Sequence, residues 1–327
     1  MPAMETLRLT LRPRSAFGGP LRGDTLFGQL CWAVRNRRGE EHLRELLDGY
    51  TQGRPFAVCS DAFPAGFLPR PALPLYRFRP IPDSDRKAVK KRRWLPLQAL
   101  ARPVEDWLHE AMDDAAVVRQ QAGTSAPARL ASHRAQPHNS IDRRSGTTGP
   151  GAFAPYTQAQ YWYAQGTQLD LYLLLDPERI GRDEAITLID DIGRTGYGRD
   201  ASIGLGKFDV TAADPATLVA APDANACFTL APCAPQGLGL RPDRAFYEVF
   251  TRFGRHGDRA VYGRGGPFKT PVLLAGTGGL FAMDSPPRAG FLGQGLGGAG
   301  RMSKTIPETV QQGYAPCAAV RLNWEAA

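Results

Sequence analysis

The segment GYGRDASIGLGKF, residues 196 to 208, constrains the fold most tightly, because glycine-rich loops of this kind are common in nucleotide-binding proteins. Gly196, Gly198 and Ala201 match the pattern G-x-G-x-x-G/A, which requires a strand before the loop and a helix after it. The order here is reversed. Residues 183–193 space their apolar side chains along one helical face, and residues 205–212 are typical of a strand. We therefore expect a helix to enter the loop and a strand to leave it, which excludes a Rossmann site.

A P-loop is excluded at the same place. The pattern G-x-x-x-x-G-K-[ST] ending on Gly206 and Lys207 needs glycine at position 201 and serine or threonine at position 208. The chain has Ala201 and Phe208 there. Neither kind of nucleotide loop fits this segment.

The first half of the chain predicts a split βαβ sheet. Residues 6–12 alternate Leu7, Leu9 and Leu11 with polar side chains, as a half-buried strand does. Residues 24–38 carry an apolar helical stripe that Asp24 is expected to cap and Gly39 to end, and residues 40–50 form a second short helix. The nearly continuous apolar run in residues 168–176 predicts a central strand. With the helix and strand around the glycine loop, this is the order of a ferredoxin-like fold.

The segments between these elements are expected to be irregular. Seven prolines in residues 54–82 predict an ordered loop, and the basic run 86–93 is either a solvated, mobile segment or a docking patch. One helix is expected over 103–121. Residues 123–153 show no period and predict a long loop of the kind that is functional or disordered.

The second half restarts after an Ala, Pro and Asp-rich linker over 214–226. It contains another glycine-rich stretch, residues 293–304, followed by a late strand-like segment, which we interpret as a degenerate structural repeat. The fold class predicted is α+β, with two ferredoxin-like domains spanning residues 1–213 and 222–327.

Charge favours a polyanionic partner. The chain carries a net charge of +8, and its first 103 residues hold 19 Lys and Arg against 9 Asp and Glu. The five cysteines form no CxxC pair and the five histidines show no metal-ligand spacing, so we expect core thiols, no metal and no cofactor. No apolar run is long enough for a membrane span and no signal peptide is visible, so the expected location is the cytoplasm.

Two glycine-rich loops with basic neighbours indicate RNA binding without cleavage. Glycines let backbone N–H groups approach a phosphodiester closely, and Arg199, Lys207, Arg301 and Lys304 supply charge. Phe17 and Tyr197 are candidates for stacking on bases. The alternative is a metal-independent endoribonuclease in which His138 acts as general acid or base, although no second base is identifiably paired with it.

Several long motifs, in order along nearly the whole chain, carry a resemblance. They are SAFGGPLRGDTLFGQLCWAVRNRRGEE, SDAFPAGFLPRP, the segment from HNSIDRRSGTTG to GAFAPY, GYGRDASIGLGKF and SKTIPETVQQGYAPC. Together they resemble the RAMP-superfamily subunit that caps the 5′ end of the guide RNA in type III CRISPR effector complexes, the fourth subunit of the Csm complex. The chain departs from that pattern at Gln311, where the family leads us to expect histidine.

The resemblance implies a scaffold and not a nuclease. It implies two RRM-like domains that hold the repeat-derived 5′ handle of the CRISPR RNA, with the large polymerase-like subunit on one side and the first backbone subunit on the other. The expected RNA-binding residues lie in four segments: Phe17, Gly18, Gly19, Arg22, Gly23, Asp24 and Thr25; His138, Asn139, Arg143, Arg144, Thr147 and Thr148; Tyr197, Gly198, Arg199, Asp200, Ser202, Gly204, Gly206 and Lys207; and Gly297, Gly298, Arg301, Ser303 and Lys304.

Overall fold

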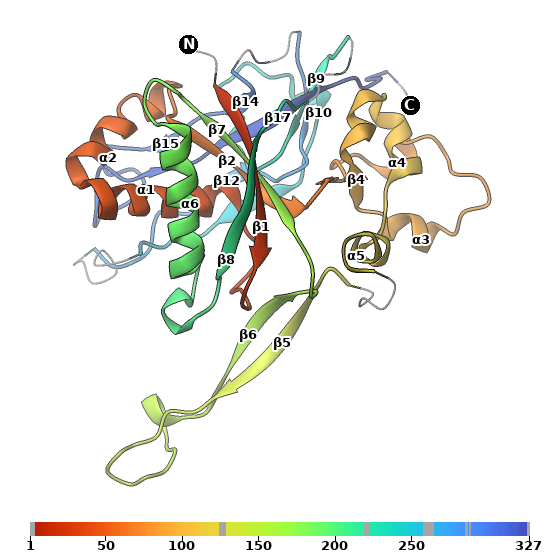
Figure 1. The fold of residues 1–327 in the computed structure, drawn as a ribbon. Helices are drawn as coiled ribbons and strands as arrows, with labels where there is room; N and C mark the ends of the chain where they lie inside the picture. Colours follow the sequence, from red (N-terminus) through yellow and green to blue (C-terminus); the bar gives the residue numbers. More distant parts are fainter. Residues whose placement is uncertain are drawn as a thin grey trace.

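The computed structural model describes residues 4–123, 129–218, 221, 223–257, 265–284, 287 and 289–325. Its N-terminal half is built on a four-stranded antiparallel sheet with the order β2-β7-β1-β8 (Figure 1). The strands are β1 (Glu5–Pro13), β2 (Ala57–Pro64), β7 (Leu169–Leu175) and β8 (Phe208–Pro215). This is the strand order of a split βαβ sheet, as the sequence predicts.

The apolar patterns place these strands correctly. The alternating Leu7, Leu9 and Leu11 of β1 are buried in the core, and their polar neighbours are not. β7 is buried along its whole length and lies between β1 and β2, which confirms the prediction of a central strand. One face of the sheet packs on helices and the other, through Tyr172, on the C-terminal half.

Three helices flank the sheet: α1 (Gly23–Arg38), α2 (Glu40–Leu47) and α6 (Arg182–Thr195). α1 packs against β2 and α6, and α6 against β8. Gly39 ends α1 with a φ of 94°, as expected. The prediction that Asp24 caps α1 is wrong, because the cap residue is Arg22, and the carboxylate that accepts from the first N–H group of the helix, at Gly23, is that of Asp61, at 2.8 Å. The Asp24 carboxylate binds Arg252 instead.

An insertion between β2 and β7 contains short elements where a proline-rich loop is predicted. Residues of that loop belong to β2 and to β3 (Phe67–Pro69), which pairs with β4 (Trp94–Pro96). The loop prediction is wrong over these residues because Pro64 and Pro69 occupy strand ends, where a missing N–H is tolerated. The basic run begins with the short helix α3 (Arg86–Lys91), whose basic side chains are exposed.

The helix predicted over 103–121 is two helices, α4 (Trp107–Glu110) and α5 (Asp114–Ala122). Between them Met112 exchanges backbone hydrogen bonds with Trp94 of β4, which interrupts the helical ladder. Asp113 then caps α5, its carboxylate accepting from the Ala116 N–H at 2.9 Å.

The prediction of a long loop over residues 123–153 is also wrong in its first part. Residues 131–138 form β5 (Ala131–His138), which pairs with β6 (Tyr156–Tyr163) along its entire length. This hairpin, residues 131–163, extends away from the body of the molecule (Figure 1), and we call it the arm. Residues 124–128 lie outside the described part of the chain.

The C-terminal half is a five-stranded sheet with the order β10-β13-β9-β17-β14. Its strands are β9 (Ala226–Thr229), β10 (Ala245–Phe246), β13 (Leu280–Ala282), β14 (Phe291–Gly293) and β17 (Tyr314–Val320). Two short ribbons accompany it, one of β11 (Val249–Arg252) with β12 (Val272–Ala275) and one of β15 (Leu296–Gly297) with β16 (Val310–Gln311). The α+β class is confirmed.

A second ferredoxin-like domain is not confirmed, because no α-helix occurs among the described residues after α6. The predicted linker falls between β8 and β9, and residues 219, 220 and 222 of it lie outside the described part of the chain. The second glycine-rich stretch begins at the end of β14 and includes β15, and no helix leads into it, so it resembles the first one in composition but not in structural context.

Two hydrophobic clusters each contain residues from both halves. The cluster around β1 and the helices includes Phe291 and Tyr314 from the C-terminal half, and a second cluster joins Tyr172 to Phe228 and Val320. Four cysteines are buried, Cys31 is half-buried, and all five are free, in agreement with core thiols. None of the helices in the described segments is long and apolar enough to cross a membrane.

One ion pair joins the halves at a fully buried carboxylate. Arg252 of β11 donates from Nε and Nη2 to the two oxygens of Asp24 at 2.5 and 2.6 Å, and Gln311 donates to the same carboxylate at 3.1 Å. Asp24 has no solvent-exposed side-chain surface. Removal of the guanidinium would leave a buried, underpaired charge.

We expect Arg252→Ala to lower the free energy of unfolding by about 3–5 kcal/mol, and Arg252→Lys, which keeps the charge but loses the bidentate geometry, to lower it by less. Urea unfolding followed by far-UV circular dichroism measures both. The control is Arg241→Ala, which removes an exposed ion pair and is expected to leave the free energy of unfolding nearly unchanged. A similar small change in Arg252→Ala would contradict the proposed role of this pair.

Candidate nucleic-acid interface

A groove of about 1240 Å³ runs between α1, the loop after α6 and the segment around β11. Its lining carries seven basic side chains and three acidic ones: Arg22, Arg37, Arg194, Arg199, Arg252, Arg255 and Lys269 against Asp24, Asp191 and Asp200. This net positive charge suits a polyanion.

The groove brings together many of the residues predicted from sequence. They come from two segments far apart in the chain, the N-terminal turn and the glycine loop: Gly18, Gly19, Arg22, Asp24 and Thr25, with Tyr197, Gly198, Arg199, Asp200 and Ser202. The helix-loop-strand order around the second segment is confirmed by α6 and β8. Phe17, Gly23, Gly204, Gly206 and Lys207 belong to the same two segments but do not line the groove.

The glycines of the loop fall into two classes. Gly206 has a φ of +78°, and a Cβ there would lie 2.2 Å from the backbone oxygen of Tyr197. Gly196 is equally closed, with the Leu205 oxygen 2.4 Å from a Cβ position. Gly198 and Gly204 also have positive φ values, of +76° and +92°, but nothing lies within 4 Å of their Cβ positions. The first two glycines close the loop, whereas the other two leave open space beside the backbone.

Arg199 fastens three segments at the edge of the groove. Its Nε donates to the Gly18 oxygen at 2.9 Å and its Nη2 to the Ala159 oxygen of the arm at 3.3 Å. Asp200 is in the left-handed conformation at a φ of 66°, and its Oδ2 lies 3.7 Å from Arg199 Nε. A Cβ at Gly18 would lie 2.4 Å from Arg199 Cγ, so glycine is needed there. Despite these contacts, 61% of the Arg199 side-chain surface remains exposed to solvent.

The proposed stacking role of Phe17 and Tyr197 does not agree with the structure. Both rings are buried, Phe17 completely and Tyr197 at 4% exposure. The Tyr197 hydroxyl accepts from the Arg22 N–H at 2.8 Å and donates to the Pro20 oxygen at 3.2 Å. Burial raises the pKa of Tyr197 above its ordinary value. These rings hold the N-terminal turn in place and offer no free face to a base.

Three other residues of the N-terminal turn also make close contacts within the protein. Asp24 is buried against Arg252, so its prediction as a direct RNA contact is wrong in this conformation. Gly23 is buried with a Cβ position 2.2 Å from the Cys59 oxygen. Arg22 donates to the carboxylate of Asp61 at 2.6 Å. Burial raises the pKa of Asp61 above its ordinary value, and the charge of Arg22 opposes part of that increase. Arg22 keeps about a third of its side chain exposed in the groove.

Sequence reasoning missed the contribution of the β11 segment to the groove. Phe253 is 74% exposed there, and Arg255 has no carboxylate partner among the described residues. Lys269 lines the floor, where burial lowers the pKa of its ammonium group. The sequence TRFGR, residues 251–255, interleaves basic and aromatic residues and was the one local signal for this part of the site.

The predicted residues of the arm lie at its outer end and outside the groove. His138 ends β5 and stacks on Tyr156, with ring centroids 5.3 Å apart. Its Nε2 has no hydrogen-bond partner among the described residues. The remaining side chains predicted here are exposed around the turn that follows: Asn139, Arg143, Arg144, Thr147 and Thr148.

The second glycine loop does not line the groove. Arg301 folds over its own loop and donates to the Gly297 oxygen at 2.6 Å, while Gly298 is open and Lys304 is exposed. Ser303 is buried, with its Oγ 2.7 Å from Nε2 of His256, which does line the groove. Gln311, the departure from the family pattern, lines the groove and donates to Asp24. Within the described segments, no three His, Cys, Asp or Glu side chains gather as metal ligands.

Comparison with known proteins gives matches among solved structures. No protein-family model and no curated protein sequence matches the chain. A chain in the crystal structure of a Csm1–Csm4 cassette in complex with pppApA is 15% identical at a TM-score of 0.57, and the match covers 98% of this chain and 100% of that one. A chain of the Csm3–Csm4 subcomplex of the type III-A CRISPR-Cas interference complex is 12% identical at a TM-score of 0.57, covering 94% and 98% of the two chains.

The same cassette in complex with cA4 matches at 16% identity and a TM-score of 0.55, over 97% of this chain and 99% of the other. Csm4 is the component that these structures have in common. The strand order, the basic groove and the near-complete coverage therefore lead to one conclusion: this chain has the fold of Csm4, the subunit that the sequence motifs resemble.

Proposed function

We propose that the protein is a non-catalytic, RNA-binding subunit of a type III-A CRISPR effector complex. In this proposal it binds the repeat-derived 5′ handle of the CRISPR RNA and links the large polymerase-like subunit to the backbone subunits. The groove is the observation that carries the proposal. Seven basic and three acidic side chains line it, and it borders the glycine loop, in which Gly198 and Gly204 have open space beside them.

Each part of the groove has a task in this proposal. Gly198 leaves space beside its Cα for a phosphate to enter, because nothing lies within 4 Å of its Cβ position. Its own N–H already donates to Gln29 Oε1 at 3.0 Å, so side chains supply the charge that binds the phosphate. Arg255 and the exposed part of Arg199 supply charge along the same channel. Phe253 replaces Phe17 and Tyr197 as the ring on which a base stacks, since its side chain is exposed in the groove.

The partners follow from the structural neighbours. Those structures contain Csm4 with Csm1 in one case and with Csm3 in the other. We propose that this chain assembles with the equivalent large and backbone subunits, in the cytoplasm. The division into residues 1–213 and 222–327 also belongs to the proposal, with the C-terminal sheet as a strongly altered counterpart of the N-terminal one.

The alternative, an endoribonuclease that uses His138, has weaker support. His138 lies on the arm and outside the groove. Among the described residues, no carboxylate, lysine or second histidine is hydrogen-bonded to it, and its ring stacks on Tyr156. General acid–base catalysis requires a positioned partner for each proton, and the described arm supplies none.

The first prediction from this proposal concerns Gly198, one of the two open glycines of the loop. Gly198→Ala is expected to weaken binding of the 5′ handle RNA at least about tenfold, because the added methyl group occupies the space a phosphate would enter. Fluorescence anisotropy with labelled handle RNA measures the affinity.

Gly237→Ala is the matched control. Gly237 has the same φ of +76°, the same open surroundings and a position outside the groove. The two variants therefore carry similar backbone strain, and a thermal melt of each checks that they fold equally well. If both variants bind RNA as the wild-type protein does, the loop is only a turn.

The second prediction concerns Arg255. Arg255→Gln is expected to weaken binding for all RNA sequences alike and to reduce the slope of log K against log salt concentration by about 0.7, the value of one phosphate contact on a single strand. Titrations at four or more salt concentrations give the slope. Arg241→Gln, whose arginine lies outside the groove, is expected to leave it unchanged. An unchanged slope in Arg255→Gln would remove this residue from the interface.

The third prediction separates the scaffold from the endoribonuclease. Labelled repeat RNA incubated with excess protein and EDTA is expected to stay intact, since His138 has no catalytic companion. Gel electrophoresis of the RNA is the measurement. Discrete cleavage that is lost in His138→Ala would favour the endoribonuclease over the scaffold.

A further inference from the structure

Most of the basic side chains in the groove already have a carboxylate partner within the protein. Five arginines form such ion pairs at 2.5 to 3.7 Å: Arg22 with Asp61, Arg37 with Asp191, Arg194 with Asp190, Arg199 with Asp200, and Arg252 with Asp24. The side chains of the other two basic residues, Arg255 and Lys269, have no ion pair or hydrogen bond with any described residue. These two residues therefore carry the uncompensated positive charge of the groove.

Lys269 is half-buried, although its ammonium group has no counter-ion. Its stem packs beside Gly254, where a Cβ would lie 3.0 Å from Lys269 Cδ. Burial lowers the pKa of the Lys269 ammonium group; the charge of Arg252 acts in the same direction, whereas Asp24 and Cys31 oppose it. Partial burial of an unpaired ammonium group costs folding free energy, and no contact in the described part of the chain offsets that cost. The fold itself gives no reason for a lysine at this position.

The fold places Arg255 beside Lys269. The Lys269 N–H donates to the Gly254 oxygen at 2.9 Å, and Arg255 forms a β-bridge with Phe268. The Arg255 guanidinium lies 6.0 Å from the centroid of the exposed Phe268 ring, a contact that uses none of its N–H donors. Two free cations from paired segments of the chain thus line one wall of the groove.

Aromatic rings line the groove near these cations. Phe253 is 74% exposed, and Trp32 of α1 is half-buried. Trp32 Nε1 lies 3.8 Å from the Cβ position of Gly257, so its indole borders the segment that carries Arg255. Cations interleaved with aromatic rings suit the phosphates and bases of a single-stranded nucleic acid. An acidic peptide would satisfy the cations and leave the rings unused.

We propose that Arg255 and Lys269 form the phosphate-binding subsite of the groove. The ligand is the sugar-phosphate backbone of the bound RNA. The inference rests on the proposed function, because that function assigns the RNA to the groove. It adds that these two residues supply the largest share of the electrostatic attraction, since a phosphate that approaches a paired arginine also meets the carboxylate of the pair.

The subsite couples RNA binding to the protonation of Lys269. A phosphate beside the ammonium group favours its charged form, so binding raises the pKa of Lys269 above its value in the free protein. At a pH between these two values, binding takes up a proton. The RNA affinity is therefore expected to be constant below the pKa of the free protein and to fall by up to about tenfold per pH unit above it.

The titratable neighbours of Lys269 do not obscure this effect. Burial raises the pKa of the Cys31 thiol to about 12, so it stays neutral well above neutral pH. Burial and the charge of Lys269 lower the pKa of His256 below its ordinary value, so it is already neutral at neutral pH. Arg252 and Arg255 keep their charge throughout.

The test compares Lys269→Met and Lys269→Arg with the wild-type protein by fluorescence anisotropy with labelled handle RNA, from about pH 7 to about pH 10. At neutral pH, Lys269→Met is expected to bind at least about tenfold more weakly and to reduce the slope of log K against log salt concentration by about 0.7. Lys269→Arg is expected to bind within about threefold of wild type. It is also expected to lose less affinity than wild type as the pH rises, because arginine stays charged. Titration of the RNA bases affects both proteins equally.

Stability provides a second readout. Lys269→Met is expected to unfold at the same temperature as the wild-type protein or at a higher one, because methionine replaces a half-buried, unpaired charge. A thermal melt measures this. Loss of RNA affinity without loss of stability distinguishes a ligand contact from a structural contact.

Lys90→Met is the matched control. Lys90 is exposed on α3 and does not line the groove, so this variant makes the same change in side chain and in net charge away from the site. Its RNA affinity is expected to stay within about twofold of wild type, which removes long-range electrostatics as an explanation.

Three results would overturn the proposal: wild-type affinity in Lys269→Met at neutral pH, equal losses in Lys269→Met and Lys90→Met, or the same pH profile in Lys269→Arg and the wild-type protein. Failure of the proposed function looks different. In that case the wild-type protein itself does not bind the handle RNA at any pH.

Discussion

The buried pair of Asp24 and Arg252 is the constraint on which the site depends. Asp24 lies in the first turn of α1 and Arg252 at the end of β11, 228 residues later, so this contact fixes the first helix against the C-terminal half. Asp61 makes a second link between the halves, because its carboxylate accepts from Arg22 and from the Thr277 hydroxyl, both at 2.6 Å. Between them these contacts hold the N-terminal turn beside the β11 segment. The groove lies between the N-terminal turn and the β11 segment. Charged contacts, in addition to apolar packing, hold these two segments in place relative to one another.

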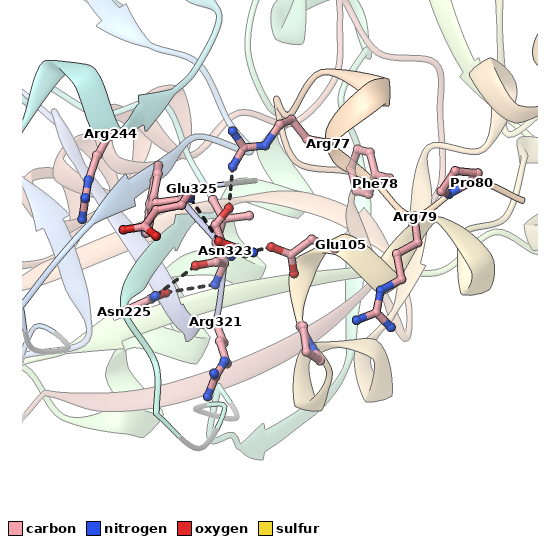
Figure 2. A pocket seen from close by; sticks show the side chains of 13 residues that line it. Arg77, Phe78, Arg79, Pro80, Glu105, Asn225, Arg244, Arg321, Asn323 and Glu325 are labelled. Carbon is pink, nitrogen blue, oxygen red and sulfur yellow. Dashed lines mark hydrogen bonds between the residues drawn. The ribbon is translucent and has the colours of Figure 1, made fainter. Parts of the chain in front are cut away.

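The groove and the pocket drawn in Figure 2 differ in the side chains that line them. The groove is predominantly basic and borders backbone that a thin, flexible strand of phosphates can approach. The pocket of about 770 Å³ beside residues 321–325 is lined by four arginines and two glutamates together with Trp324 (Figure 2).

The sequence predicted the elements whose signal is local and missed those whose signal is distant. The alternating leucines predicted strand β1 correctly, and the helical apolar face predicted helix α6 correctly, because both apolar faces are buried in the core. The arm was missed because β5 is exposed on both faces, so its sequence has no apolar period and only pairing with β6 makes it a strand. Asp24 as a buried ion and Lys269 as a groove residue depend on contacts between distant parts of the chain, which no local pattern records, whereas Arg255 had a local signal in TRFGR that was not used.

The root of the arm is fastened to the same residues that shape the groove. Phe17 and Tyr161 exchange two backbone hydrogen bonds of 2.8 Å, and Arg199 reaches from the glycine loop to Ala159. The base of the arm therefore lies at the edge of the groove, and Arg199 joins it there to Gly18. Arg143 and Arg144 are exposed at the opposite end of the arm. A displacement of that end that tilts the whole hairpin would have to break or carry along the hydrogen bonds at its base.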